Sequence, residues 1–375
     1  MKVPYFSPWI TQQDKKSVLK SLNQRWFTNG PNLELFEKNF SNYIKCKYSL
    51  GVSSATSALH LSLLALGIKK NDEVIVPVMT FAATADAVTF CGAKVVFCDV
   101  DYDTFNISVT DIKKKITKKT KAIIIVHYGG QSCDIYEIKK LCKEKNIFLI
   151  EDCAHALGSN YKNIKCGTFG IIGCFSFYPT KIITTGEGGM LVTNDKIIAS
   201  KIKLLRSHGM NIIPRLREEK KLWAYDIMEM GYNYRLDDIR ASLGLSQLKR
   251  VELINKKRMD IAKKYFNKLS RIKGITLPVQ KRDRNHIFHL FTIKIENDYP
   301  LTRDELFQKL ISNGIGTSVQ YIPLHHMTYQ KSKNKFKKNE FPISDKLKNQ
   351  ILSLPIFPTM SLKQIDYVVN QLVIK

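Results

Sequence analysis

The chain has 375 residues, of which 44% are hydrophobic and 10% aromatic, and its 59 Lys and Arg against 33 Asp and Glu give a formal net charge of +26. A chain this apolar can bury enough surface to offset its conformational entropy, so the composition excludes intrinsic disorder and predicts one large or two coupled domains. The longest aliphatic stretches are too short to cross a bilayer, and residues 1–5 contain no apolar export segment, so we expect a cytoplasmic protein without a membrane partner.

From residue 50 to about residue 200, short apolar runs alternate with segments of helical period. The runs that predict strands are residues 73–76, 94–99, 122–127 and 147–151, and the predicted helices are residues 55–66, 82–90 and 135–145. Ser53 or Ser54 is the N-cap candidate of the first helix. This alternation is typical of βα units, so it predicts an α/β fold with a mainly parallel sheet that helices cover on both faces.

The rest of the chain predicts a smaller α+β domain. Residues 238–270 indicate two successive helices or one broken helix, residues 287–295 a strand, and residues 303–312 a helix. Residues 317–322 and a last helix from its N-cap Ser361 to about Leu372 complete this part. We expect a large domain over residues 1–250, with an N-terminal arm over residues 1–30, and a small domain over residues 251–375.

The positive charge and the cysteines say less about function. The basic residues are 47 Lys and 12 Arg, and the basic runs at residues 113–121 and 331–338 lack the interleaved aromatic residues of nucleic-acid-binding surfaces. We therefore expect a solvated lysine surface and no nucleic acid partner, although the positive field would attract an anionic small substrate. The eight cysteines form no CxxC pair, which agrees with reduced thiols in the cytoplasm.

Two side chains occupy positions that favour chemistry. Asp152 follows the apolar run of residues 147–151, where open parallel sheets bind ligands, although an aspartate there can also cap a turn. Lys181 lies between the aromatic residues 175–178 and the glycine-rich residues 186–189. Partial burial would lower the pKa of its amine and make it a nucleophile, whereas the alternative is a loop lysine that extends to solvent.

Four separated motifs together resemble the DegT/DnrJ/StrS family of sugar aminotransferases. They are residues 53–60 (Ser-Ser-Ala-Thr-Ser-Ala-Leu-His), residues 151–158 (Glu-Asp-Cys-Ala-His-Ala-Leu-Gly), residues 175–189 around Lys181, and residues 231–235 (Gly-Tyr-Asn-Tyr-Arg). These are pyridoxal 5′-phosphate (PLP) enzymes of the aspartate aminotransferase fold, also called fold type I. The resemblance implies PLP as cofactor and a mainly parallel sheet of the seven-stranded type in the large domain.

The resemblance also implies a role for each matching residue. Lys181 resembles the Schiff-base lysine, and Asp152 resembles the carboxylate that keeps the pyridine nitrogen of PLP protonated. His155 matches the position that reaches the phenolic oxygen of PLP, although a hydrogen-bonded turn histidine is the alternative. The remaining implied cofactor-binding residues are Thr56, Ser57 and Ser176 at the phosphate, Phe81 on the ring, and Asn233, which family dimers contribute from the neighbouring subunit.

The implied reaction moves an amino group from an amino acid, usually L-glutamate in this family, to a nucleotide-linked keto sugar. Residues 314–325 resemble the sugar-nucleotide segment, so Tyr321, His325 and also Arg235 are candidate substrate-binding residues, although Gln320 stands where many members have His. We expect a homodimer with shared active sites, no metal ion, amination at C4, and a role in amino-sugar or surface polysaccharide biosynthesis. The alternatives are a PLP-dependent lyase of the same fold and a DNA-binding regulatory protein.

Overall fold

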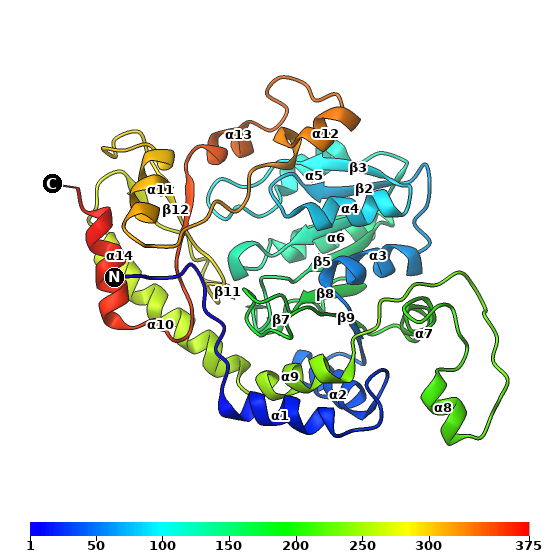
Figure 1. Cartoon of the computed structure of the whole chain (residues 1–375). Coiled ribbons are helices and arrows are strands. Elements are labelled where there is room, and N and C mark those ends of the chain that lie inside the picture. Colours follow the sequence, from blue (N-terminus) through cyan, green and yellow to red (C-terminus); the bar gives the residue numbers. More distant parts are fainter. Residues whose placement is uncertain (375) are drawn as a thin grey trace.

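The computed structural model describes residues 1–374 and contains a seven-stranded, mainly parallel sheet (Figure 1). Only β9 runs against the other six strands. In spatial order the strands are β1 (Tyr48–Val52), β9 (Gly189–Thr193), β8 (Ile172–Ser176), β5 (Phe148–Asp152), β4 (Thr120–Val126), β2 (Glu73–Pro77) and β3 (Lys94–Cys98). The predicted α/β class and the mainly parallel sheet are confirmed.

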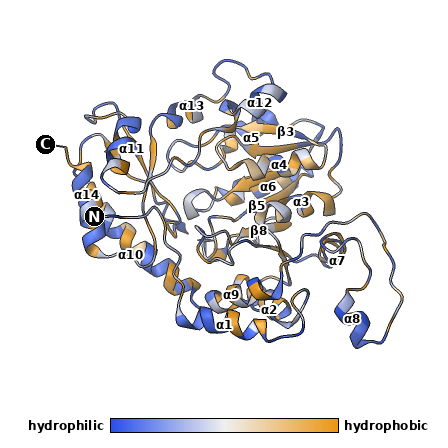
Figure 2. Cartoon of the chain, in the orientation of Figure 1, coloured by the Kyte–Doolittle hydropathy of each residue, from blue (hydrophilic) through white to orange (hydrophobic). Residues whose placement is uncertain are grey.

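Helices cover both faces of this sheet. Successive side chains of a strand point to opposite faces, so the apolar strands present apolar side chains on both faces of the sheet, and helices bury them. Ile124 of β4 packs with α3 (Ala55–Ala65), α4 (Ala82–Phe90) and α7 (Lys196–Leu205). Ile123 and Ile125 pack with α5 (Val109–Lys115) and α6 (Ile135–Lys145). On β8 and β9, Phe175 and Met190 pack with α2 (Pro31–Ile44) and α9 (Asp238–Leu248). The interior of the sheet is accordingly mostly apolar (Figure 2).

The predicted elements of the first 200 residues all form, with bounds that differ by a few residues at most. The N-terminus of α3 shows why such elements can be predicted, because its capping groups are local. The Ser54 hydroxyl accepts a hydrogen bond from Ser57 N–H at 3.0 Å, and the Ser57 hydroxyl accepts one from Ser54 N–H at 3.0 Å. This reciprocal capping box satisfies two N–H groups that the helix itself leaves without acceptors.

A second, three-stranded antiparallel sheet lies in the C-terminal part: β10 (Ile275–Thr276), β12 (Phe291–Ile295) and β13 (Ile351–Leu354). It packs with α10 (Val251–Leu269), α11 (Arg303–Ser312) and α14 (Leu362–Leu372). Residues 238–270 therefore form two successive helices, α9 and α10. The predicted strand over residues 287–295 begins only at Phe291, because Phe288 has a left-handed backbone with φ of 50°.

The N-terminal residues cross to the C-terminal part of the molecule (Figure 1). Val3 is buried in the same cluster as the second sheet, and its N–H and C=O bond to Gly314 and Gly316. The division at residue 250 remains a prediction. The other elements are α1 (Gln12–Leu22), α8 (Pro214–Glu219), α12 (Thr328–Lys333), α13 (Pro342–Lys348), the 3₁₀ turns η1 (Tyr128–Gly130) and η2 (Leu324–His326), and the short strands β6 (Asn160–Tyr161), β7 (Ile164–Lys165) and β11 (Arg284–Asn285). Within residues 1–374, no helix is both long and apolar enough to span a membrane.

Candidate active site

A cavity of about 450 Å³ lies where the carboxyl ends of the parallel strands meet. Open α/β sheets bind ligands at this edge, and the volume is in the range of small-molecule sites. Seven of the predicted site residues line it: Thr56, Phe81, Asp152, His155, Ser176, Lys181 and Tyr321. These residues come from segments between positions 56 and 321, so the fold brings the separate motifs together.

Lys181 lies in the connection between β8 and β9, and burial shapes its chemistry. Desolvation lowers the pKa of its amine from 10.5 to about 8, while the nearby Asp152 carboxylate acts in the opposite direction. The connection folds back on itself, because Phe177 N–H bonds to Gly188 C=O at 2.9 Å and Thr185 N–H bonds to Phe177 C=O at 3.0 Å. Lys181 therefore has an amine of lowered basicity on a segment that main-chain hydrogen bonds hold in place.

Asp152 is the last residue of β5 and is almost fully buried, at 6% exposure. Burial raises the pKa of its carboxyl, and the Ala154 N–H, the Lys181 amine and the Thr84 hydroxyl counteract this rise. Ala154 N lies 3.0 Å from Oδ1, and Thr84 Oγ1 lies 3.1 Å from Oδ2. A protonated ring nitrogen placed against this carboxylate would supply the cationic partner that its buried position favours.

Thr84 and Thr80 are site residues that sequence reasoning missed. Thr80 Oγ1 lies 2.9 Å from Thr84 Oγ1, so the two hydroxyls form a chain that ends on Asp152. Both threonines are buried. The sequence contains a signal for this pair. The two threonines are four positions apart where the chain enters a predicted helix, a spacing that places side chains on the same side.

His155 is held between main chain and side chain. The Gly129 N–H donates to Nδ1 at 3.3 Å, so the proton of the neutral ring is on Nε2, which lies 3.0 Å from the Tyr321 hydroxyl. Desolvation, followed by the charge of Lys181, lowers the pKa of His155 well below 6.5. His155 is therefore a neutral donor beside Tyr321 in the wall of the cavity.

The N-terminus of α3 and the end of β8 form a second wall. Ser54, Ala55 and Thr56 line the cavity there, and first-turn N–H groups of a helix attract anions. Ser176 adds a hydroxyl. Ser57 lies behind this wall, is buried and uses its hydroxyl in the capping box, so it supports the helix start rather than lining the cavity.

Phe81 stands at the opening of the cavity with 63% of its surface exposed. Its ring centroid lies 6.2 Å from that of Tyr321, with 48° between the ring planes. An aromatic ring with this exposure buries little of its surface in its own subunit. It is accordingly free to contact a flat ligand.

Three predicted site residues lie away from the cavity. Asn233 is exposed and pairs with Ser207, and Arg235 is half-buried and pairs with Val52. His325 is buried, with Nε2 at 2.8 Å from Asp345 Oδ1 and its ring against Phe341. The single subunit thus does not bring these three to the other site residues.

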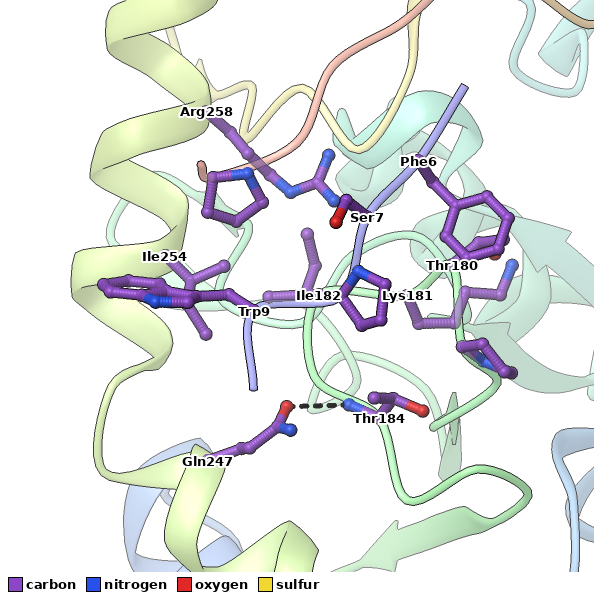
Figure 3. Close-up of a pocket in the computed structure, with 13 residues that line it drawn as sticks. Phe6, Ser7, Trp9, Thr180, Lys181, Ile182, Thr184, Gln247, Ile254 and Arg258 are labelled. Atoms are coloured by element: carbon purple, nitrogen blue, oxygen red, sulfur yellow. Dashed lines mark hydrogen bonds between the residues drawn. The ribbon is translucent and has the colours of Figure 1, made fainter. Parts of the chain in front are cut away.

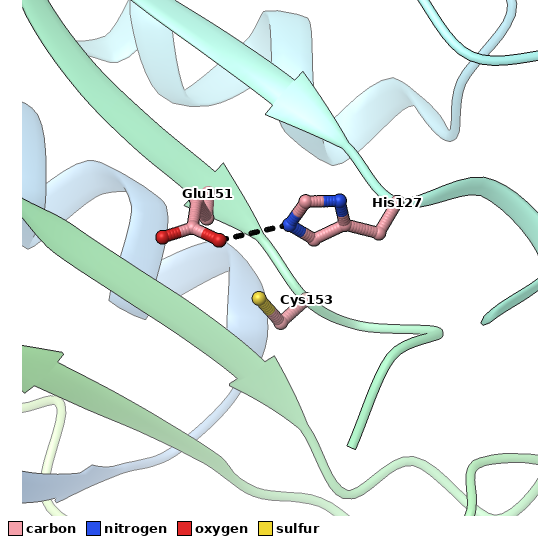
Figure 4. A group of neighbouring side chains, drawn as sticks. All are labelled: His127, Glu151 and Cys153. Atoms are coloured by element: carbon pink, nitrogen blue, oxygen red, sulfur yellow. Dashed lines mark hydrogen bonds and ion pairs between the residues drawn. The ribbon is translucent and has the colours of Figure 1, made fainter. Parts of the chain in front are cut away.

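Two further features border the site. Residues 6–9 run between α10 and the segment that carries Lys181, and leave a cavity of only about 10 Å³, the size of a water molecule (Figure 3). Next to Asp152, Glu151 accepts a hydrogen bond from His127 (Figure 4). It also accepts hydrogen bonds from the N–H groups of Gly167, Phe169 and Gly170. Four donors occupy this carboxylate, so the His127, Glu151 and Cys153 group is a structural network.

The donor set around the cavity fits PLP. A buried carboxylate for the ring nitrogen, a neutral histidine, an amine of lowered pKa, a helix N-terminus with hydroxyls for the phosphate, and an exposed aromatic ring all face one space. The ring and the phosphate of PLP require these groups.

Comparisons with known proteins agree with this site. The model of the DegT/DnrJ/EryC1/StrS aminotransferase family matches residues 8–373. GDP-perosamine synthase from Escherichia coli O157:H7 is 38% identical over 371 residues, which cover 98% of this chain and 96% of that protein. The spore coat polysaccharide biosynthesis protein SpsC from Bacillus subtilis is 37% identical over 98% of this chain and 95% of that protein.

The Spr1654 protein from Streptococcus pneumoniae, solved with pyridoxamine phosphate, has a TM-score of 0.94 at 29% identity, and the match covers 99% of this chain and 98% of that chain. Its PLP form has a TM-score of 0.93. Fold and site together define a PLP-dependent aminotransferase of fold type I. The chain belongs to the DegT/DnrJ/EryC1/StrS aminotransferase family, and it is a sugar aminotransferase. The predicted family, fold class, enzyme class and cofactor are confirmed.

Proposed function

We propose that the enzyme transfers the amino group of L-glutamate to C4 of a nucleotide-linked keto sugar, for an amino sugar of a surface polysaccharide. One observation carries the proposal: the Lys181 amine, with its pKa lowered to about 8, shares a cavity with the buried Asp152 carboxylate. The names of the relatives agree with the substrate class, since one contains a GDP-linked amino sugar and another a polysaccharide.

When bound, PLP supplies an electron sink for the negative charge that deprotonation leaves on the α-carbon of the donor. Lys181 Nζ would take up the proton from this carbon and deliver it to the C4′ carbon of PLP. A pKa of about 8 suits an amine that both accepts and donates a proton at neutral or slightly alkaline pH. Asp152 keeps the ring nitrogen protonated, and Thr84 orients Asp152. With PLP bound, His155 Nε2 would turn from Tyr321 to donate to the phenolic oxygen of PLP, Thr56 and Ser176 would bind its phosphate, and Phe81 would contact its ring.

The proposal includes a homodimer. Tyr232 and Tyr234 stack on each other and lie against His60 of their own subunit. In an extended segment, Asn233 and Arg235 point to the opposite side, which suits contacts with a partner's site. The preceding segment exposes Leu222, Trp223, Tyr225, Ile227, Met228 and Met230, with Trp223 at 91% exposure. Such an apolar segment, which stands apart from the body with α8 (Figure 1), is typical of a surface that another subunit covers.

The cytoplasm is the proposed location. The eight cysteines are free thiols, and six of them are buried. A reducing compartment keeps such thiols unpaired.

The test incubates the purified enzyme with PLP, L-glutamate and nucleotide-linked 3-keto and 4-keto sugars, and identifies the products by mass spectrometry and NMR. We expect a 4-amino sugar nucleotide and 2-oxoglutarate. Lys181→Ala is the inactive control, and Lys203→Ala, on the exposed face of α7, is the matched lysine control that keeps wild-type turnover. A 3-amino product, or turnover only with another amino acid, would overturn the position or the donor.

The same assay separates the alternatives. A PLP-dependent lyase would consume a substrate without transferring nitrogen from glutamate. A cysteine-dependent desulfurase would need a mobile-loop cysteine in the C-terminal half, and the sequence has none after Cys174. A DNA-binding regulator would bind DNA with strong salt dependence and would show no turnover.

A further inference from the structure

The N-terminal arm of the chain reaches the cavity through Tyr5. The arm is fixed by two main-chain hydrogen bonds, from Val3 N–H to Gly314 C=O at 2.9 Å and from Gly316 N–H to Val3 C=O at 2.8 Å. Gly316 permits this approach, because a Cβ atom there would lie 2.3 Å from Tyr5 N. The Tyr5 hydroxyl therefore lies against the side chain of Gln320, which is 315 positions away in the sequence and lines the cavity.

The Tyr5 hydroxyl determines which atom of the Gln320 side-chain amide faces it. Tyr5 keeps its own proton, because burial raises the pKa of its phenol, and it donates this proton to Gln320 Oε1.

The main chain of Gln320 is held as well, because the Tyr128 hydroxyl donates to its C=O. With Oε1 occupied, the remaining polar group of the side chain is the amide nitrogen. Among residues 1–374, none accepts a hydrogen bond from Gln320 Nε2. Two N–H donors of fixed orientation are therefore available to a ligand in the cavity.

We propose that Gln320, oriented by Tyr5, is a specificity-determining residue that donates a hydrogen bond to an oxygen of the substrate's sugar ring. The inference rests on the proposed nucleotide-sugar substrate and adds which group of the protein selects the sugar. An amide nitrogen donates and does not accept, so it favours a hydroxyl or keto oxygen at that place and disfavours a deoxy position.

The experiment separates the two half-reactions. Gln320→Met keeps the length of the side chain but removes the amide donor without adding a charge, and Tyr5→Phe removes only the orienting hydroxyl. We expect each to raise KM for the nucleotide sugar about threefold to tenfold, the effect of one neutral hydrogen bond. The reaction with L-glutamate alone, followed by cofactor absorbance, should keep its wild-type rate. Tyr299→Phe is the matched control, because its buried phenol donates to Leu372 C=O within the C-terminal core.

A binding measurement gives a second readout. By calorimetry, Gln320→Met should weaken binding of the nucleotide sugar and leave binding of the corresponding nucleoside diphosphate unchanged. Unchanged KM in both variants, or equal weakening of the sugar nucleotide and the nucleoside diphosphate, would overturn the role of Gln320. The wild-type enzyme is assayed before any variant. If it aminates no keto-sugar nucleotide at all, the proposed function fails, and the role of Gln320 is not what the result contradicts.

Discussion

Replacing Thr84 by valine tests how the structure controls Asp152. Valine has the shape of threonine but lacks the hydroxyl, so the packing of α4 stays while the 3.1 Å hydrogen bond to Asp152 Oδ2 is lost. Apart from this bond, the carboxylate accepts one direct hydrogen bond, from Ala154 N–H at 3.0 Å. Both Thr84 and Asp152 are buried.

A hydrogen bond to a charged group contributes about 1.5–3 kcal/mol. Since one pKa unit corresponds to about 1.4 kcal/mol, the loss should raise the pKa of Asp152 by about 1–2 units. Burial already raises this pKa, and the change acts in the same direction. Because the ionised form is the active one, the acid limb of the pH profile should move to higher pH by the same amount.

The assay is the rate of the L-glutamate half-reaction, followed by cofactor absorbance between about pH 5 and 9, a window that spans the usual pH range of enzymes. Thr89→Val is the matched control, because Thr89 lies on the same helix, is exposed and bonds only to Ala85 C=O at 3.2 Å. Its profile should coincide with that of the wild type. An acid limb of Thr84→Val that also coincides with the wild type would refute the role of Thr84.

Four further changes test the remaining site. Lys181→Ala should abolish the L-glutamate half-reaction while the protein still binds PLP, measured by absorbance and equilibrium dialysis, and a wild-type rate would contradict the assignment. Asp152→Asn keeps the shape but removes the charge, so steady-state turnover should fall by about 10²–10³-fold, as for loss of an electrostatic stabiliser; near-normal turnover would make Asp152 a turn cap. Lys181→Ala mixed with Asn233→Asp under subunit exchange should regain activity, because one site of each heterodimer then holds both native residues, and failure of rescue in proven heterodimers would place both in one subunit's site. Ser54→Ala should destabilise the protein by about 1 kcal/mol in urea denaturation, the usual effect of losing an N-cap, and an unchanged midpoint would show that the cap is dispensable.

Local signals account for the elements that were predicted correctly. The helix α11 begins at a capping box between Thr302 and Glu305, and α14 begins at one between Ser361 and Gln364. The groups that satisfy these helix ends lie within three residues, so the sequence pattern contains them. Strand β12 was predicted too long because the left-handed backbone at Phe288 interrupts an apolar run that alternation alone cannot divide.

The sequence by itself determined the alternation of strands and helices and the order of the motifs, because each depends on residue types at short spacing. The family resemblance of these motifs predicts Lys181 and Asp152 as the reactive pair. Only the tertiary structure decided which neighbours tune them. Thr84 meets Asp152 across 68 positions, and Tyr5 meets Gln320 across 315 positions. It also decided that Ser57 caps a helix behind the cavity. Hydrogen bonds between distant segments follow from how helices and strands pack, and burial sets the pKa values of the groups that they enclose, so neither can be obtained from residue spacing.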